Sequence, residues 1–188
     1  MIKVRKSSSR RICQGDVFRD IEFLEYASEK SGIIEVSKIV FPLVIVLTQD
    51  CDLEQDYQYR WSEEARVKKD QDKWLLSVLV APLYNADHVF QGSHLSNLNI
   101  TMQLINRKKT PGDYVISNQN PRYHYFEFPK DINIVPSIVD FKHYFSVNIN
   151  YLKKVKRRNF VCRVSELFRE DISQRFASFL ARVALPER

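Results

Sequence analysis

The chain has 188 residues and a mass of 22.3 kDa, a common size for one globular domain. Its 29 Lys and Arg residues exceed its 23 Asp and Glu residues, and the net charge of +6 favours an anionic partner. Because the chain has only four glycines, a glycine-rich phosphate loop and a dinucleotide fingerprint are excluded. The three cysteines, Cys13, Cys51 and Cys162, form no CxxC pair, which indicates reduced thiols rather than a zinc ribbon or a disulfide framework.

The first eleven residues are basic, and no apolar segment follows them as a signal peptide would require. The longest apolar run, residues 39–47, is interrupted by Pro42 and is far shorter than the roughly 20 residues of a membrane span. We therefore expect a cytoplasmic protein without a membrane partner. No cofactor and no bound metal are expected, because the sequence contains no motif for either.

Residues 1–11 are predicted to form a flexible basic arm, and residues 12–188 a single domain, because no linker rich in Pro, Gly or Ser divides them. Within this domain, residues 12–90 are expected to be barrel-like, and residues 91–188 to add strands and a C-terminal helix. Continuous runs of β-branched and apolar residues predict buried strands at 41–48 and 74–83. Four further strands are predicted at 17–25, 33–38, 122–128 and 137–147.

Apolar residues at helical spacing predict two helices. One is expected in the middle of the chain and ends at 110–112; its apolar positions are Leu95, Leu98, Met102 and Ile105. The other covers 166–184 and ends before Pro186; its apolar face consists of Ile172, Phe176, Phe179, Leu180 and Val183. The predicted fold class is therefore mainly β with helical additions, in the form of a small β-barrel.

The candidate catalytic residues directly follow the strand at 43–47, where a rigid element would hold them at the surface. They are Thr48, Asp50, Cys51 and Asp52. Acidic neighbours disfavour an activated Cys51 thiolate, so a packed or strand-terminal thiol is the alternative. None of the four histidines has a spacing that identifies it as a partner for Cys51.

Residues 50–72 hold eight acidic and four basic side chains and are expected to form an acidic loop with a short helix at 62–69. The loop lacks the glycine that an EF-hand needs at its sixth position, so an EF-hand is excluded. A looser Mg²⁺ site and a solvated acidic loop remain as alternatives.

The strongest electrostatic feature is a run of five cations within six residues, at 153–158. Aromatic residues flank this run, and a second aromatic and basic group lies at 122–125. Cations that neutralise phosphates and rings that stack on bases are typical of surfaces that bind single-stranded nucleic acid; a solvated turn is the alternative. The candidate nucleic-acid-binding residues are Tyr151, Lys153, Lys154, Lys156, Arg157, Arg158 and Arg122.

Three short segments resemble the MazF/PemK-like toxins over about residues 12–90. They are Gly15-Asp16-Val17-Phe18, Phe41-Pro42-Leu43-Val44-Ile45-Val46 and Leu79-Val80-Ala81-Pro82-Leu83. The resemblance implies an SH3-like β-barrel and, as the usual activity, metal-independent cleavage of single-stranded RNA. It also implies a homodimer and an antitoxin-like protein partner.

The chain departs from this family at the positions that carry catalysis. Phe41 stands where the family has a catalytic Arg, and the acidic loop replaces the segment that holds the catalytic Thr or Ser. We therefore expect a bacterial protein that binds nucleic acid, in particular single-stranded RNA, without the catalytic residues of the family. One alternative is an endoribonuclease with a remodelled site, in which Arg60, Arg66 or Arg122 acts on the phosphate. The other is a protein–protein interaction module in a toxin or defence system.

Overall fold

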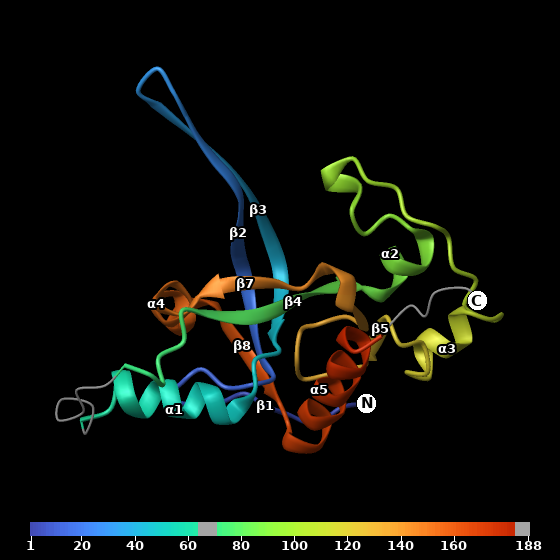
Figure 1. Ribbon diagram of the computed structural model, residues 1–188. Coiled ribbons are helices and arrows are strands. Elements are labelled where there is room, and N and C mark those ends of the chain that lie inside the picture. Colours follow the sequence, from blue (N-terminus) through green and yellow to red (C-terminus); the bar gives the residue numbers. More distant parts are fainter. Residues whose placement is uncertain (64–70, 183–188) are drawn as a thin grey trace, which may run out of the picture. The chain divides into compact units, whose positions relative to one another are not determined.

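The computed structural model describes residues 1–63 and 71–182 (Figure 1). It is mainly antiparallel β-sheet with several helices, which confirms the predicted fold class at this level. Some predicted features lie outside the described residues: most of the short helix at 62–69, the side chain of Arg66, and the end of the C-terminal helix at Val183 and Pro186.

The chain divides into two compact units, and each is assembled from stretches that are distant in the sequence. The first unit contains residues 5–82 and 144–163. The second unit contains residues 1–4, 83–143 and 164–188. The single domain expected for residues 12–188 stays a prediction; residues 144–163, expected as an addition to the barrel-like part, belong to the first unit.

The first unit is built around an antiparallel sheet with the strand order β8-β2-β3-β4-β7. These strands are β2 (Asp16–Lys30), β3 (Ile33–Val46), β4 (Ser77–Asn85, whose last three residues belong to the second unit), β7 (Phe145–Asn148) and β8 (Phe160–Val164). The helices of this unit are α1 (Asp50–Arg60) and α4 (Ile149–Asn159).

The core of the first unit lies on one face of this sheet, which curves around it. Phe18, Val44 and Val80 contribute fully buried side chains from three different strands. Leu53 of α1 and Leu152 of α4 join the same cluster, so both helices are held by apolar burial.

Strands β2 and β3 continue as a long hairpin that projects well beyond β4 and β7 (Figure 1). Ser31 and Gly32 form its turn with φ values of 55° and 78°, a conformation that suits a two-residue hairpin. The predicted strands at 33–38 and 41–48 are therefore one strand. Pro42 is tolerated within it because its position is skipped in the pairing with both neighbours: β2 pairs with Phe41 and Leu43, and β4 pairs only with Val44–Val46.

The second unit contains the last residues of β4, from Leu83, together with β6 (Ser137–Asp140) and β5 (Tyr123–Phe126), paired in that order and antiparallel. Its helices are α2 (Ala86–Gln91), α3 (Gly112–Ile116) and α5 (Glu166–Leu180). The predicted strand at 137–147 is wrong in its extent, since a 3-10 turn at Phe141–His143 separates β6 from β7.

The helix predicted around Leu95 to Ile105 is also wrong. Only Ser96–Leu98 form a short 3-10 turn, which ends at Asn99 in the left-handed region. The later residues run alongside the end of α2, because Met102 N–H donates to the carbonyl of Gly92 and Ile105 N–H donates to that of Phe90. The helical spacing of apolar residues therefore does not correspond to a helix here.

The expected flexible arm is held by specific contacts. Within the second unit, Ile2 is buried and its N–H donates to the carbonyl of Glu127. Val4–Arg5 form the short strand β1. Within the first unit, the Arg11 guanidinium pairs with the Asp50 carboxylate at 2.7 Å. The basic charge of residues 1–11 predicted a flexible arm, but it could not reveal these contact partners.

Helix α5 confirms part of the prediction for the C-terminal segment. Ile172 and Phe176 are buried, and Phe176 and Phe179 both contact the ring of Phe141, with centroid distances of 5.5 and 5.8 Å. Leu180, expected to hold the helix, is 50% exposed and therefore does not do so.

Strand β5 buries an uncharged histidine. His124 is 2% exposed and lies between the rings of Phe126 and Phe141, with centroid distances of 4.5 and 6.4 Å. Burial lowers the pKa of His124 to about 3, and the positive charge of Arg175 acts in the same direction.

Protonation of His124 is therefore expected to destabilise the fold in acid. Between about pH 6.5 and pH 3 the unfolded chain binds a proton at this residue and the folded chain does not, so the free energy of unfolding falls as the pH is lowered. His124→Gln should show a shallower fall over this range than the wild-type protein in urea denaturation. Equal slopes for the two proteins would contradict the assignment.

In the described parts of the chain, 1–63 and 71–182, no helix combines the length and apolar character needed to cross a lipid bilayer.

Candidate nucleic-acid interface and histidine cluster

The predicted catalytic residues at the end of β3 make structural contacts. Thr48 Oγ1 accepts a hydrogen bond from the Leu79 N–H at 2.6 Å, which links the end of β3 to β4. Asp50 accepts two hydrogen bonds from Arg11, at 2.7 and 3.0 Å, and one from the Gln14 N–H at 3.0 Å. These contacts fix the start of α1 and account for both residues without a catalytic role.

Cys51 and Asp52 are exposed in the first turn of α1. The Cys51 Sγ lies 3.6 Å from Gln49 Oε1 and 3.7 Å from Asp52 Oδ1. Neither neighbour is a cation or a base that would activate a thiolate, so the local geometry gives no support to a nucleophilic role.

The acidic segment begins as helix α1 and not as the expected loop. Asp56, 1% exposed, pairs with Arg60 at 2.7 Å and accepts a hydrogen bond from the Leu75 N–H at 2.7 Å. Arg60 also donates to the Leu75 carbonyl, so it is not positioned to act on a phosphate. Among the residues that the structure describes, no acidic group of this segment belongs to a cluster with metal-binding geometry.

The basic run at 153–158 lies on the helix α4 and not in a turn. Two of its five cations are directed toward the protein. Lys153 Nζ lies 3.2 Å from the ring centroid of Trp61, and burial lowers the pKa of Lys153 to about 8. Lys156 is 6% exposed; its Nζ donates to the Arg11 carbonyl and lies 3.5 Å from Asp16 Oδ2.

The other three cations form an exposed basic face on α4. Lys154, Arg157 and Arg158 are three and four residues apart, a spacing that places them on one side of the helix. Together with Val155 and Asn159 they line a hollow of about 800 Å³. We call these three residues the α4 basic face.

The basic arm lies beside α4 within the first unit. The Lys156 ammonium donates to the backbone carbonyl of Arg11, and Arg163 Nη2 donates to Ser9 Oγ at 2.8 Å. Arg10, between these two positions, is exposed. The fold therefore brings together two basic segments that are about 145 residues apart in the sequence.

Two further candidate residues are engaged in the structure. Tyr151 is half-buried against the core of the first unit, and its hydroxyl accepts a hydrogen bond from the Glu22 N–H at 3.3 Å. Arg122, in the second unit, holds the buried carboxylate of Asp140 through Nε, at 2.8 and 3.0 Å, and through Nη2. Arg122 is thus committed to an ion pair, and it belongs to a different unit from the α4 basic face.

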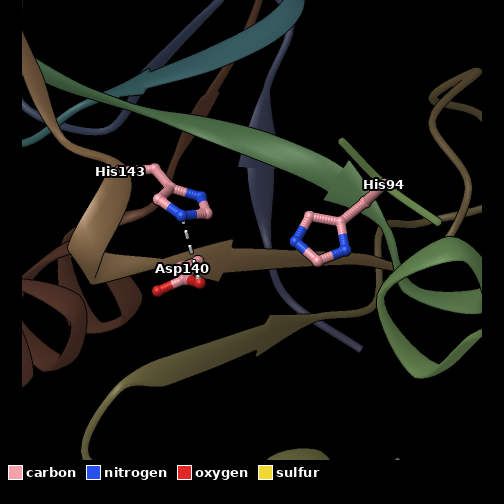
Figure 2. A group of neighbouring side chains, drawn as sticks. All are labelled: His94, Asp140 and His143. Carbon is pink, nitrogen blue, oxygen red and sulfur yellow. Dashed lines mark ion pairs between the residues drawn. The ribbon is translucent and has the colours of Figure 1, made fainter. Parts of the chain in front are cut away.

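The second unit contains a cluster that the sequence analysis missed. His94, Asp140 and His143 place one potential ligand atom each within 4.8 Å of the others. Figure 2 shows His143 beside Asp140, 3.7 Å between Nε2 and Oδ2, and the ring of His94 turned toward them. Asp140 ends β6, and His143 closes the following 3-10 turn.

Tyr84 orients this cluster from β4. Its hydroxyl lies 3.1 Å from His143 Nδ1, and its ring meets His94 at a centroid distance of 4.8 Å. Burial raises the pKa of Tyr84, so the phenol stays neutral. Burial is also the main cause that lowers the pKa of His94 and the pKa of His143, while Asp140 opposes it in both.

A cavity of about 480 Å³ in the second unit opens beside the cluster. His94 and Arg122 line it together with Asn106, Lys109 and Tyr123. Its wall thus combines an imidazole, cationic groups and an aromatic ring. This composition suits a small polar or anionic ligand.

The sequence contained only a weak signal for this cluster. Asp140 and His143 are three residues apart, but His94 lies 46 positions earlier and forms no HxxxH or HExxH motif with them. Only the pairing of β4 with β6 and the path of the chain after α2 bring the three residues together.

Comparisons of this chain with protein-family models, with curated proteins and with solved structures find no match.

Proposed function

We propose that this protein binds single-stranded nucleic acid, in particular RNA, through the α4 basic face. The observation that supports the proposal is that Lys154, Arg157 and Arg158 share one exposed side of α4 and line a hollow there. Phosphate groups are bound by such exposed cations, with release of condensed counterions.

We also propose that the first unit is an SH3-like barrel related to the MazF/PemK-like toxins. Its antiparallel sheet and the position of Gly15-Asp16 at the start of β2 support this relationship. Thr48 and Asp50 are engaged in structural hydrogen bonds, and Phe41 packs against Phe23 and Phe145, so the proposal is a binding protein and not a nuclease.

The proposal predicts a strong effect of charge removal on α4. Lys154→Ala/Arg157→Ala/Arg158→Ala should weaken binding of a labelled single-stranded RNA at least about tenfold at ~50 mM salt. The slope of log affinity against log salt should become shallower by about 2, since each lost phosphate contact contributes about 0.7. Fluorescence anisotropy at several salt concentrations measures both quantities.

The matched control removes three exposed cations elsewhere, with Lys30→Ala/Lys108→Ala/Lys130→Ala. This control variant has the same net charge as the test variant. If both variants lost the same RNA affinity, the protein would attract RNA through its total charge alone, which would contradict the proposed surface. No measurable affinity of the wild-type protein at ~50 mM salt would end the nucleic-acid proposal and favour the protein-interaction alternative. Cleavage of the RNA, followed on a gel with and without EDTA, would favour the nuclease alternative.

A further inference from the structure

We propose that His94, Asp140 and His143 form a binding site for a divalent transition metal ion, with zinc as the best-suited metal. This inference is independent of nucleic-acid binding, because every residue that carries it lies in the second unit and none belongs to α4.

The donor atoms have the chemistry and approximate spacing of such a site. Two imidazoles and one carboxylate are ligands that Zn²⁺ accepts, whereas Mg²⁺ and Ca²⁺ prefer oxygen ligands alone. Zinc–ligand bonds of about 2.0–2.2 Å place the ligands of a tetrahedral site roughly 3.3 Å apart. The 3.7 Å between His143 Nε2 and Asp140 Oδ2 is close to this value, and the largest separation in the group is within 4.8 Å. Side-chain rotations therefore suffice to complete the site.

His94 supplies the observation that is hardest to explain without a ligand. Both of its ring nitrogens are buried, and neither makes a well-formed hydrogen bond, although the His88 carbonyl lies near enough to oppose the lowering of the pKa of His94 by burial. A buried polar atom without a partner costs free energy, and native proteins rarely retain one without a reason. Coordination of a metal ion would satisfy one of these nitrogens.

The residues around the ligands hold them in the orientation that coordination requires. The contact between Tyr84 Oη and His143 Nδ1 leaves Nε2 of the same ring directed at Asp140. Metal-bound histidines usually engage their second nitrogen in this way. Asp140 is fixed by Arg122 and by the Lys142 N–H, which donates to Oδ1 at 3.0 Å. Arg122 contacts Oδ2 through Nη2 and through Nε at 3.0 Å, but the same Nε–H lies closer to Oδ1, at 2.8 Å. A metal bound at Oδ2 would take the place of this weaker Nε contact.

Three protein ligands leave one position of a tetrahedral zinc ion for an exogenous ligand, which distinguishes such a site from a closed structural one. The cavity of about 480 Å³ is lined by His94 of the cluster and by Arg122, which pairs with Asp140. A small anion or a water molecule could therefore reach the metal through it, and Arg122 and Lys109 favour a negatively charged occupant.

The test measures metal binding by tag-free full-length protein with ZnCl₂ and CoCl₂, using calorimetry and a competing chelator. We expect one Zn²⁺ per chain, and visible d–d absorption of the Co²⁺ form. His94→Ala and His143→Gln should each weaken Zn²⁺ binding at least about 100-fold. Tyr84→Phe should weaken it about tenfold, since it removes only a contact to a ligand. MgCl₂ should produce no binding heat.

His88→Ala is the matched control, because His88 lies on α2 in the same unit but is exposed and outside the cluster. Its Zn²⁺ affinity should equal that of the wild-type protein, as should that of the triple variant of the α4 basic face. Circular dichroism checks that each variant is folded. If His94→Ala unfolds, His143→Gln still tests the cluster, because glutamine keeps a polar side chain at that position. Wild-type protein without stoichiometric Zn²⁺ binding, or folded cluster variants that bind as tightly as His88→Ala, would overturn the proposal.

Discussion

Asp16→Ala is expected to lower the free energy of unfolding by about 3–5 kcal/mol, the cost of removing one partner from a buried ion pair. Asp16 is fully buried at the start of β2. Its carboxylate lies 2.5 Å from Arg163 Nε and 3.5 Å from Lys156 Nζ, and it accepts a hydrogen bond from the Cys13 N–H at 2.9 Å. Without it, two largely buried cations would lose their counterion.

Urea denaturation of wild-type and Asp16→Ala protein measures this effect. Asp16→Asn separates charge from shape, because the amide keeps the volume but not the negative charge, and it should recover only a small part of the loss. Glu22→Gln is the control, since it breaks a 2.6 Å pair with Lys38 in which both side chains are about half exposed. That variant should unfold at nearly the wild-type urea concentration. A loss below about 1 kcal/mol for Asp16→Ala would contradict the role assigned to this carboxylate.

Phe176→Ala is expected to cost about 3–5 kcal/mol by leaving a cavity between α5 and the rest of the second unit. The Phe176 ring is 6% exposed and packs against Phe141, which is itself fully buried. Phe141 follows directly after β6, so the contact joins the C-terminal helix to the sheet of its own unit.

Leu180→Ala provides the comparison within the same helix. Leu180 is 50% exposed, and its truncation should change the free energy of unfolding by no more than about 0.5 kcal/mol. Thermal and urea unfolding of both variants would measure the difference. Similar losses of unfolding free energy at the two positions would show that the whole apolar face holds the helix, as its periodicity predicts, and that Phe176 has no special role.

The strands with continuous apolar residues were predictable because burial and β-branching act locally. The segments at 41–48 and 74–83 correspond to the end of β3 and to most of β4. Their extent was harder to predict, because large apolar side chains of the hairpin, such as Leu24, Ile34 and Val36, are exposed and burial does not mark its strands.

The errors arose where tertiary contacts outweigh periodicity. Leu95 and Ile105 have helical spacing, but the left-handed conformation at Asn99 and the backbone hydrogen bonds to the end of α2 prevent a helix. The basic run at 153–158 was correctly recognised as the main positive feature. Its sequence could not show that Lys153 and Lys156 turn toward an aromatic ring and a buried carboxylate, which leaves three cations exposed.

The candidate sites show the same contrast. Asp50 was selected because it follows a strand, whereas its partner Arg11 lies 39 residues earlier and turns it into a structural group. His94 and His143 were considered only as partners for Cys51 and were not singled out, because their proximity depends on the fold and not on any local motif. A site assembled from distant residues needs the fold before its chemistry can be recognised.

The discontinuous make-up of the two units has a consequence for synthesis on the ribosome. Residues 5–82 lack β7, α4 and most of β8, and with them Leu152 and Val147 of their core, until residue 163 has left the exit tunnel. The second unit in turn waits for α5 before Phe141 is covered. Neither core can close before its late segments have been made, so apolar strands stay uncovered until then, a state that is prone to aggregation.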